Sequence, residues 1–289
     1  MTMDNTHHTV AVVGATGQQG GAATRALLNN GFTVRAITRR VDSDAARELA
    51  DAGAEIVAAD LEDPASVRKA FAGADGVFAM TTMSETGGTE SPTEAETRHG
   101  TIIADAAKAA GVQHLVYSSV GAADRGTGIP HFESKHRVEQ YIASIGLPAT
   151  IIRPVFFMEN LRAEVQDGRV VLALPLPDGI PMQMVAAADI GRVASAVMLD
   201  AAWVGRSIEI AGDTRTGSEM AAAFGRAAGL PAEYRALPIS VLDGNHDMRA
   251  MFSWFTEPDT YAADFAATRA LDPGVQDLDA WITANGWTA

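Results

Sequence analysis

The chain has 289 residues, which is long enough to bury a sizeable core in one large or two small domains. It contains no cysteine, so disulfides, thiolate catalysis and cysteine-ligated metals are excluded, and we predict no metal site. The net charge of −14 argues against direct contact with nucleic acid or an anionic membrane, and no apolar run is long enough to span a bilayer, so we expect a cytoplasmic protein.

The first predicted elements are a buried strand at 9–14 and a helix at 18–30, joined by a turn with three glycines spaced three apart. This order is typical of a dinucleotide-binding site. The first glycine permits the turn, the second lets the backbone approach a pyrophosphate at the helix N-terminus, and the third lets the helix pack closely on the strand. The turn residues expected to contact the cofactor are Gly14, Thr16, Gly17, Gln18, Gln19 and Gly20.

The second predicted strand, 32–38, ends in Arg39 and Arg40. An acidic residue at this place would bind the free ribose 2′-hydroxyl of NAD, whereas arginine suits a 2′-phosphate. We therefore expect NADP(H), with Arg39 as the first contact and Arg40 assisting. Two alternatives stay open, because solvated arginines at a strand end would look the same and because the nearby Asp42 keeps NAD(H) in consideration.

Strands and helices alternate through the first half of the chain, which predicts an α/β protein with a Rossmann-type, doubly wound parallel sheet flanked by helices. Further strands are expected at 54–58, 75–80, 113–118 and 148–153, and helices at 43–52, 64–72, 93–110 and 131–145. Asp60 and Leu61 follow the third strand and could bind and cover an adenine, although Asp60 could equally cap the helix that starts near Asp63. Thr81 and Thr82 follow the fourth strand and either line the cofactor groove or only terminate the strand.

Polar residues also follow the fifth strand and open the next helix. Ser118 and Ser119 end the strand, and His131 and Lys135 lie four residues apart, hence on one face of the helix. Lys135 could hydrogen-bond the ribose beside a nicotinamide, Ser119 could polarise a substrate carbonyl, and Ser118 could contact the substrate. The alternatives are a solvated charge for Lys135 and a helix-start residue without a chemical role for His131.

After residue 154 the composition changes to proline and turn signals at 172–181, followed by a helix at 189–199 and a strand at 207–211. Helices are then predicted at 218–228, 245–255 and 278–285. We expect a dinucleotide-binding domain made of residues 1–154, with 186–212 returning to it. The remainder, mainly 155–185 and 213–289, should form a smaller, mostly helical lobe on the substrate side.

Aromatic and methionine side chains follow the sixth strand and recur in the expected lobe. Phe156 is expected beside the cofactor, and the residues expected to face a substrate are Phe157, Asn160, Met184 and Trp254. Aromatic rings and flexible thioethers make an adaptable apolar pocket, although each residue alone is also explained as ordinary core. As a group they favour an apolar or aromatic substrate over a sugar.

These motifs occur together in one order along the chain. They are the GATGQQG turn, Thr38-Arg39-Arg40, Tyr117-Ser118-Ser119, His131-Phe132-Glu133-Ser134-Lys135, and Arg153-Pro154 through Glu159-Asn160-Leu161. The set resembles the NmrA-like family of atypical short-chain dehydrogenase/reductases over nearly the whole chain. The resemblance implies a Rossmann domain that binds NADP(H), a smaller C-terminal lobe, and Lys135 at the nicotinamide ribose or substrate. The family includes redox-sensing regulators without turnover, and its relatives include quinone and isoflavone-type reductases.

One position departs from the wider superfamily, in which a tyrosine four residues before the lysine donates a proton. Here that position holds His131. An imidazole can serve as a general acid near neutral pH. A quinone needs little acid help in any case, because its reduced form is a stabilised anion. With histidine in place of the tyrosine, the sequence fits a catalytic protein as well as one that has lost catalysis.

The leading hypothesis is an NAD(P)H-dependent reductase of quinone-like or other apolar carbonyl compounds, in which His131 donates a proton where one is needed. The alternative is a non-catalytic NADPH/NADP sensor that regulates a partner protein, which requires that the partner distinguish the cofactor-bound form from the free form. A sugar-nucleotide epimerase is the third option, and the missing tyrosine and apolar lobe argue against it. A homodimer stays open, and the sequence does not give the substrate.

Overall fold

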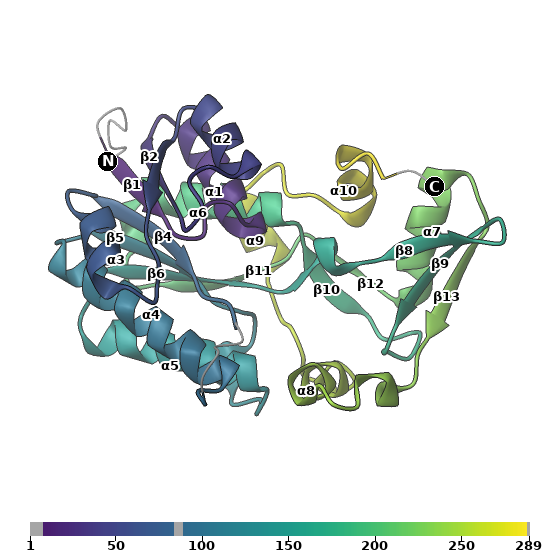
Figure 1. The fold of residues 1–289 in the computed structure, drawn as a ribbon. Coiled ribbons are helices and arrows are strands. Elements are labelled where there is room, and N and C mark those ends of the chain that lie inside the picture. The colour runs from purple at the N-terminus through teal and green to yellow at the C-terminus, as the bar shows by residue number, and fades with distance from the viewer. Residues whose placement is uncertain (1–7, 84–88, 288–289) are drawn as a thin grey trace.

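A seven-stranded parallel sheet forms the centre of the computed structural model, which describes residues 8–83 and 89–287 (Figure 1). Its strands are β1 (Thr9–Val12), β2 (Thr33–Thr38), β3 (Glu55–Ala58), β4 (Gly76–Met80), β5 (His114–Ser118), β6 (Ala149–Pro154) and β11 (Ser207–Ile210). The order is β11-β6-β5-β4-β1-β2-β3, and each neighbouring pair is parallel. The chain therefore starts in the middle of the sheet and winds to one edge before filling the other, which confirms the expected Rossmann-type topology.

Helices cover both faces of this sheet. They are α1 (Gln18–Asn29), α2 (Asp44–Asp51), α3 (Pro64–Phe71), α4 (Pro92–Ala109), α5 (Pro130–Ser144), α6 (Ala187–Leu199) and α9 (Phe265–Leu271). On one face α1 packs against α6, and on the other α4 packs against α3 and α5. Leu27 and Val193 belong to the apolar core of the first face, and Phe71 and Ile103 to that of the second. Because both faces are covered, the inner strands β1 and β4 consist mostly of apolar residues.

Local signals in the sequence determine where these elements begin. Ser91 caps α4 in a capping box with Glu94, Ser43 caps α2, and Asp63 caps α3 just before Pro64. The observed bounds of the sheet strands and of α1 to α6 differ from the predicted ones by no more than two residues. For α2, α3 and α4 this agreement reflects a side-chain cap at the start of the helix.

The rest of the chain forms a C-terminal lobe beside the sheet, at the right of Figure 1. Two three-stranded sheets, β12-β10-β7 and β13-β9-β8, make up much of it. Its elements are β7 (Phe156–Phe157), β8 (Ala163–Gln166), β9 (Arg169–Leu174), β10 (Met182–Val185), β12 (Asp213–Arg215), β13 (Ala232–Ala236), α7 (Gly217–Ala228), α8 (His246–Trp254) and α10 (Leu278–Ala284). The sequence predicts these three helices but neither sheet, so the lobe is mixed where a mostly helical one was expected.

The chain passes between the two parts more than once. After β10 it returns to the central sheet as α6 and β11, and α9 later packs against both of these elements. The lobe has an apolar core of its own, which includes the fully buried Leu172, Met184 and Phe224. Its helix α8 contacts α5 of the central layer. Within the described residues, no helix has the length and apolar character needed to cross a membrane.

Candidate functional site

The turn between β1 and α1 is built on glycines that no other residue could replace without strain. Gly14 has a φ of 63°, in the left-handed region, and its carbonyl accepts a hydrogen bond from Gly17 N–H at 2.9 Å. A Cβ atom on Gly20 would lie 2.2 Å from the Gly14 carbonyl oxygen, so only glycine fits there. The turn thus brings the N-terminus of α1, with its free N–H groups, close to the end of β1.

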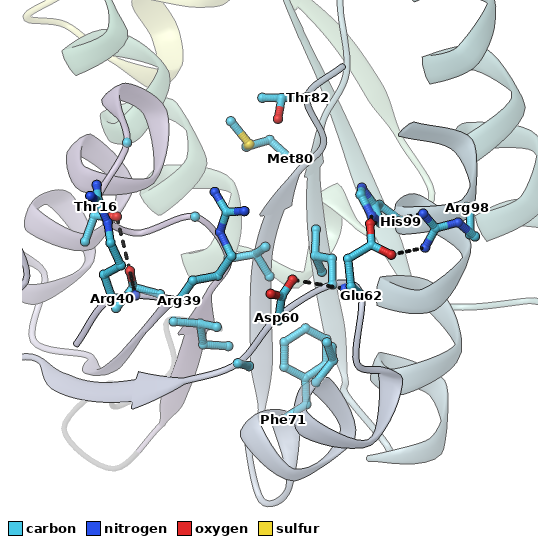
Figure 2. Close-up of a pocket in the computed structure, with 18 of the residues that line it drawn as sticks. Thr16, Arg39, Arg40, Asp60, Glu62, Phe71, Met80, Thr82, Arg98 and His99 are labelled. Atoms are coloured by element: carbon cyan, nitrogen blue, oxygen red, sulfur yellow. Dashed lines mark hydrogen bonds and ion pairs between the residues drawn. The ribbon is translucent and has the colours of Figure 1, made fainter. Parts of the chain in front are cut away.

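A cavity of about 750 Å³ lies beyond the carboxyl ends of β1, β2, β3 and β4 (Figure 2). The predicted cofactor residues in its wall are Gly14, Thr16, Gly17, Arg39, Arg40, Asp60 and Leu61. The predicted residues outside its wall are Gln18, Gln19, Gly20, Thr81, Lys135 and Phe156. Of the two threonines that follow β4, Thr82 lines the cavity. The structure therefore brings together the residues after the first three strands, as parallel strands require.

Arg39 and Arg40 leave β2 at the side of this cavity, and both side chains are exposed. In Figure 2 Arg39 extends into the pocket, while Arg40 lies beside Thr16. The backbone there is fixed by Thr38, whose hydroxyl accepts from Arg40 N–H at 3.2 Å and lies 3.3 Å from the Thr16 hydroxyl. Among the described residues neither guanidinium has a carboxylate partner. Two positive charges are thus free at the cavity.

Asp60 and Leu61 lie in the loop after β3, on the floor of the cavity. Asp60 accepts a hydrogen bond from Glu62 N–H at 3.1 Å, which fixes the carboxylate within the loop. The cap of α3 is Asp63, whose carboxylate accepts from Ala65 N–H at 3.0 Å. The sequence left open whether Asp60 caps α3 or binds a ligand. Because Asp63 is the cap, capping does not explain Asp60.

The far side of the cavity is closed by a charged cluster that the sequence analysis missed. Glu62 lies 2.6 Å from Nε2 of His99 and accepts a hydrogen bond from Arg98 at 3.0 Å (Figure 2). The hydrogen bonds from Arg98 and His99 lower the pKa of Glu62 from 4.5 to about 2, although burial slightly opposes them. The cluster ties the loop after β3 to α4. No sequence signal links residues that lie 36 positions apart.

Lys135 is held by a buried polar network rather than by solvent. Its ammonium group donates to the Thr81 carbonyl at 2.8 Å and lies 3.0 Å from Glu96, whose side chain is 1% exposed. Glu96 also accepts from the hydroxyls of Ser134, at 2.5 Å, and of Thr81, at 3.1 Å. The Thr81 hydroxyl reaches Tyr117 at 2.8 Å, and burial raises the pKa of that phenol. Thr81 and Lys135 are thus adjacent, and their buried partner Glu96 was not predicted from the sequence.

His131 lies one helical turn before Lys135 and contacts the lobe. Its Nδ1 is 2.8 Å from the carboxylate of Asp247 on α8. Of the serines after β5, Ser118 is fully buried and donates to the side-chain carbonyl of Gln19 at 2.7 Å. Ser119 is also buried, and its hydroxyl has no hydrogen-bond partner among the described residues. The Ser119 hydroxyl is therefore buried and unsatisfied in the described part of the chain, whereas Ser118 is engaged with Gln19.

The apolar residues expected at the site divide into core and surface positions. Phe156 and Met184 pair across β7 and β10 and are buried, and the Phe156 ring contacts two aromatic rings of the lobe. Phe157 is half-buried and Asn160 exposed. Trp254, also half-buried, packs edge-on against Phe132 at 5.5 Å between ring centroids. Trp254 therefore packs on the residue that follows His131, while Met184 belongs to the lobe core.

Comparison with known proteins gives matches over most of the chain. Residues 6–282 match the model of the NmrA-like family. The NmrA-like oxidoreductase FrzB of Cladobotryum sp is 42% identical over 167 residues, which are 54% of this chain and 48% of FrzB. The matched part therefore spans about half the length of that relative. The NAD(P)H azoreductase of Xenophilus azovorans is 32% identical over 235 residues, which cover 80% of this chain and 77% of the azoreductase.

The fold is also that of a solved member of the family. NmrA, a negative transcriptional regulator solved in complex with NADP, superimposes with a TM-score of 0.80 at 23% identity, over 98% of each chain. The same regulator has been solved with NAD. At this identity the likeness concerns the fold alone, and it covers the central sheet together with the lobe. The family match extends over nearly the entire sequence, and the chain therefore belongs to the NmrA-like family.

Proposed function

We propose that this protein binds NADP(H) and uses it to reduce quinone-like or other apolar carbonyl compounds. The observation that carries the proposal is the cavity beside the glycine turn, in which Arg39 and Arg40 have no carboxylate partner among the described residues. Guanidinium groups at the end of β2 suit a 2′-phosphate. The N–H groups that open α1 suit a pyrophosphate. The NADP complex of NmrA and the name of the azoreductase support the same class of ligand and reaction.

The residues present fit such a cofactor. Gly20 leaves space where a Cβ would collide with the turn. Asp60 and Leu61 line the cavity and are proposed to bind and cover an adenine. Lys135 donates a hydrogen bond to the Thr81 carbonyl and forms an ion pair with Glu96, and a remaining N–H is proposed to bind a ribose hydroxyl. When bound, NADPH supplies the hydride. The task left for the protein is to orient the substrate and to supply a proton.

We assign the proton to His131. A carbonyl that gains a hydride at carbon must gain a proton at oxygen, and an imidazolium near neutral pH is a suitable source. The buried hydroxyl of Ser119 is proposed to donate a hydrogen bond to the same oxygen. The lobe, residues 155–185 and 213–289, is proposed to hold the apolar part of the substrate, with Trp254 and Phe157 as its half-buried aromatic contacts.

The test is NADPH oxidation by the purified protein against a panel of quinones and aromatic carbonyls, beside NADPH and NADH binding titrations. We expect saturable turnover that falls sharply in His131→Ala and Lys135→Ala. If NADPH binds tightly and no acceptor is reduced, the reductase proposal fails. The family's other role, an NADPH/NADP sensor acting on a partner protein, would then be the better account.

A further inference from the structure

The imidazole of His131 is held by a carboxylate from the lobe. Asp247, the second residue of α8, lies 116 positions further along the chain. Both of its carboxylate oxygens are 2.8 Å from Nδ1 of His131, and it also accepts a hydrogen bond from the backbone N–H of His131 at 2.9 Å. The two side chains are only 14% and 15% exposed. This contact joins the two parts of the molecule at the proposed proton donor.

A helix cap alone does not explain this carboxylate. α5 begins after Ile129 without a side-chain cap, so the bond from the backbone N–H of His131 to Asp247 fills that role. A cap needs only a neutral acceptor, however, and a partly buried charge is costly unless it is paired. Burial would raise the pKa of Asp247, yet the hydrogen bond and charge of His131 lower it on balance. The contact with His131 therefore favours the charged form of the Asp247 carboxylate.

The other groups near His131 and Asp247 do not replace Asp247 as the partner of the His131 ring. Lys135 follows on the same face of α5, but Glu96 and the Thr81 carbonyl engage it. His246, next to Asp247 on α8, also lowers the pKa of Asp247. Phe132 lies edge-on to the His131 ring, with 4.7 Å between centroids, and forms an apolar wall. Asp247 is the one carboxylate in hydrogen-bond contact with His131 among the residues that the structure describes.

We propose that Asp247 is a positioning residue for proton transfer by His131, an inference that rests on the proposed function. With Nδ1 held by the carboxylate, Nε2 is the ring nitrogen that can give a proton to a substrate oxygen. In that step the Nε2–H bond breaks, an O–H bond forms, and the ring becomes neutral. The negative charge of Asp247 stabilises the imidazolium before transfer. The proton donor is thus assembled from α5 of the central layer and α8 of the lobe.

The experiment compares Asp247→Asn with Asp259→Asn, which removes the same charge from an exposed position on the lobe. Asparagine can still accept from the His131 backbone N–H, so the cap is kept. Nitrogen NMR of the His131 ring, assigned with His131→Gln, reports the tautomer without any turnover. We expect the neutral ring to carry its proton on Nδ1 in the wild type and in Asp259→Asn, and to populate both tautomers in Asp247→Asn.

Kinetics then separate positioning from capping. Asp247→Asn should lower kcat for a carbonyl substrate by roughly 10- to 100-fold, with little change in the KM for NADPH. In a His131→Tyr background it should have little further effect, because a phenol needs no such carboxylate partner. Equal losses in both backgrounds, or an unchanged tautomer, would overturn the inference. If the wild type reduces no acceptor while Asp247 still sets the tautomer, the proposed function fails and the pairing itself stands.

Discussion

Arg39 and Arg40 differ in their surroundings from Arg98, which also lines the cavity, and from Arg153 on β6. Arg98 is engaged by Glu62 and Glu90, and Arg153 by Glu139 and Asp124. A guanidinium that already holds a carboxylate must give it up before it can bind a phosphate. The arginines after β2 carry no such cost, since they have no carboxylate partner in the described part of the chain.

This difference predicts cofactor selectivity. Arg39→Ala should weaken NADPH binding by about 10- to 100-fold, because a charge-assisted hydrogen bond to the 2′-phosphate contributes about 1.5–3 kcal/mol. NADH lacks that phosphate, so its affinity should change little. Calorimetric titration of both nucleotides at one ionic strength makes the comparison, with Arg68→Ala on α3 as a control for loss of charge. An equal loss for NADPH and NADH would show that Arg39 does not read the 2′-phosphate.

Glu96 is the buried counter-charge of Lys135. Its carboxylate contacts the ammonium group at 3.0 Å and accepts from two hydroxyls, so both charges are compensated in a site that water barely reaches. Removing one partner of such a pair leaves the other charge buried and unpaired. The pair therefore fixes the ammonium group at the end of β4.

We accordingly predict that Glu96→Gln lowers the free energy of unfolding by about 3 kcal/mol. Urea denaturation measures the change. The double variant Glu96→Gln/Lys135→Met should recover part of the loss, because it removes the second charge as well. Purely additive effects of the two substitutions would show that the ion pair does not stabilise the fold.

The contacts of single residues were the part that the sequence could not predict. A glutamate within a helix is expected on the solvated face, and only the packing of α4 against α5 buries Glu96. The sequence places His131 and Lys135 on the same face of a helix because they are only four residues apart. Asp247 was not predicted as their neighbour, because 116 residues separate it from His131.

At the scale of elements, the junction of β1 and α1 depends on a backbone contact. The Cβ of any residue at position 20 would meet the carbonyl oxygen and carbon of Gly14, at 2.2 Å and 2.6 Å, and neither can move without opening the turn. At position 21 a Cβ would lie 3.2 Å from the flexible end of Arg25 and 3.3 Å from the Ala15 carbonyl. Gly20 and Gly21 are adjacent in α1, yet they differ in how well they tolerate an added side chain.

Gly20→Ala should thus destabilise the protein by about 1–3 kcal/mol and weaken nucleotide binding, because the helix N-terminus moves away from the strand. Gly21→Ala is the matched control and should change stability by no more than about 1 kcal/mol in either direction. Thermal unfolding with and without NADPH measures both effects. Equal tolerance at the two positions would mean that the turn is looser than its geometry indicates.

The elements of the central layer were predictable and the sheets of the lobe were not. Apolar runs, helix caps and glycine turns are local signals, and side-chain caps open α2, α3 and α4. The lobe strands are short, and β8 and β13 are largely exposed, so they lack an apolar run or a clear alternation. The stretch 172–181 was interpreted as a turn region because of its prolines, yet its first residues belong to β9. Pairing with distant segments stabilises these strands.

At the scale of the whole molecule, charged side chains fasten the lobe to the central layer. Glu159 accepts from Ala187 N–H at 2.9 Å and from the indole of Trp281 at 3.0 Å, so it links α6 with α10. Arg192 on α6 pairs with Asp272 at 2.8 Å. Glu159 and the pair of His131 and Asp247 thus hold the lobe at two places, and Arg192 fixes the end of α9, from which the chain continues to α10. These contacts favour a fixed relation between the two parts over free movement.

Buried ionisable groups also make the stability of the molecule depend on pH. His114, at the start of β5, is 8% exposed, and its Nε2 lies 2.7 Å from the Thr150 hydroxyl. Burial lowers the pKa of His114 from 6.5 to about 4, although the charge of Asp200 opposes this. Below pH 6.5 the unfolded chain therefore takes up a proton that the folded protein does not.

The stabilising contribution of neutral His114 is present above pH 6.5 and is lost as the pH falls towards 4. The loss should reach about 3 kcal/mol, since each unit of pKa difference is worth about 1.4 kcal/mol. Asp189, whose pKa burial raises to about 7, acts in the opposite direction over much of the same range, so the wild-type profile alone is not decisive.

The informative quantity is the difference in the free energy of unfolding between the wild type and His114→Gln, which keeps an N–H donor for Thr150. Urea denaturation at several pH values between 7 and 4.5 should show the wild type losing its advantage steadily on acidification. A difference that stays constant with pH would mean that His114 takes up its proton equally in the folded and unfolded states.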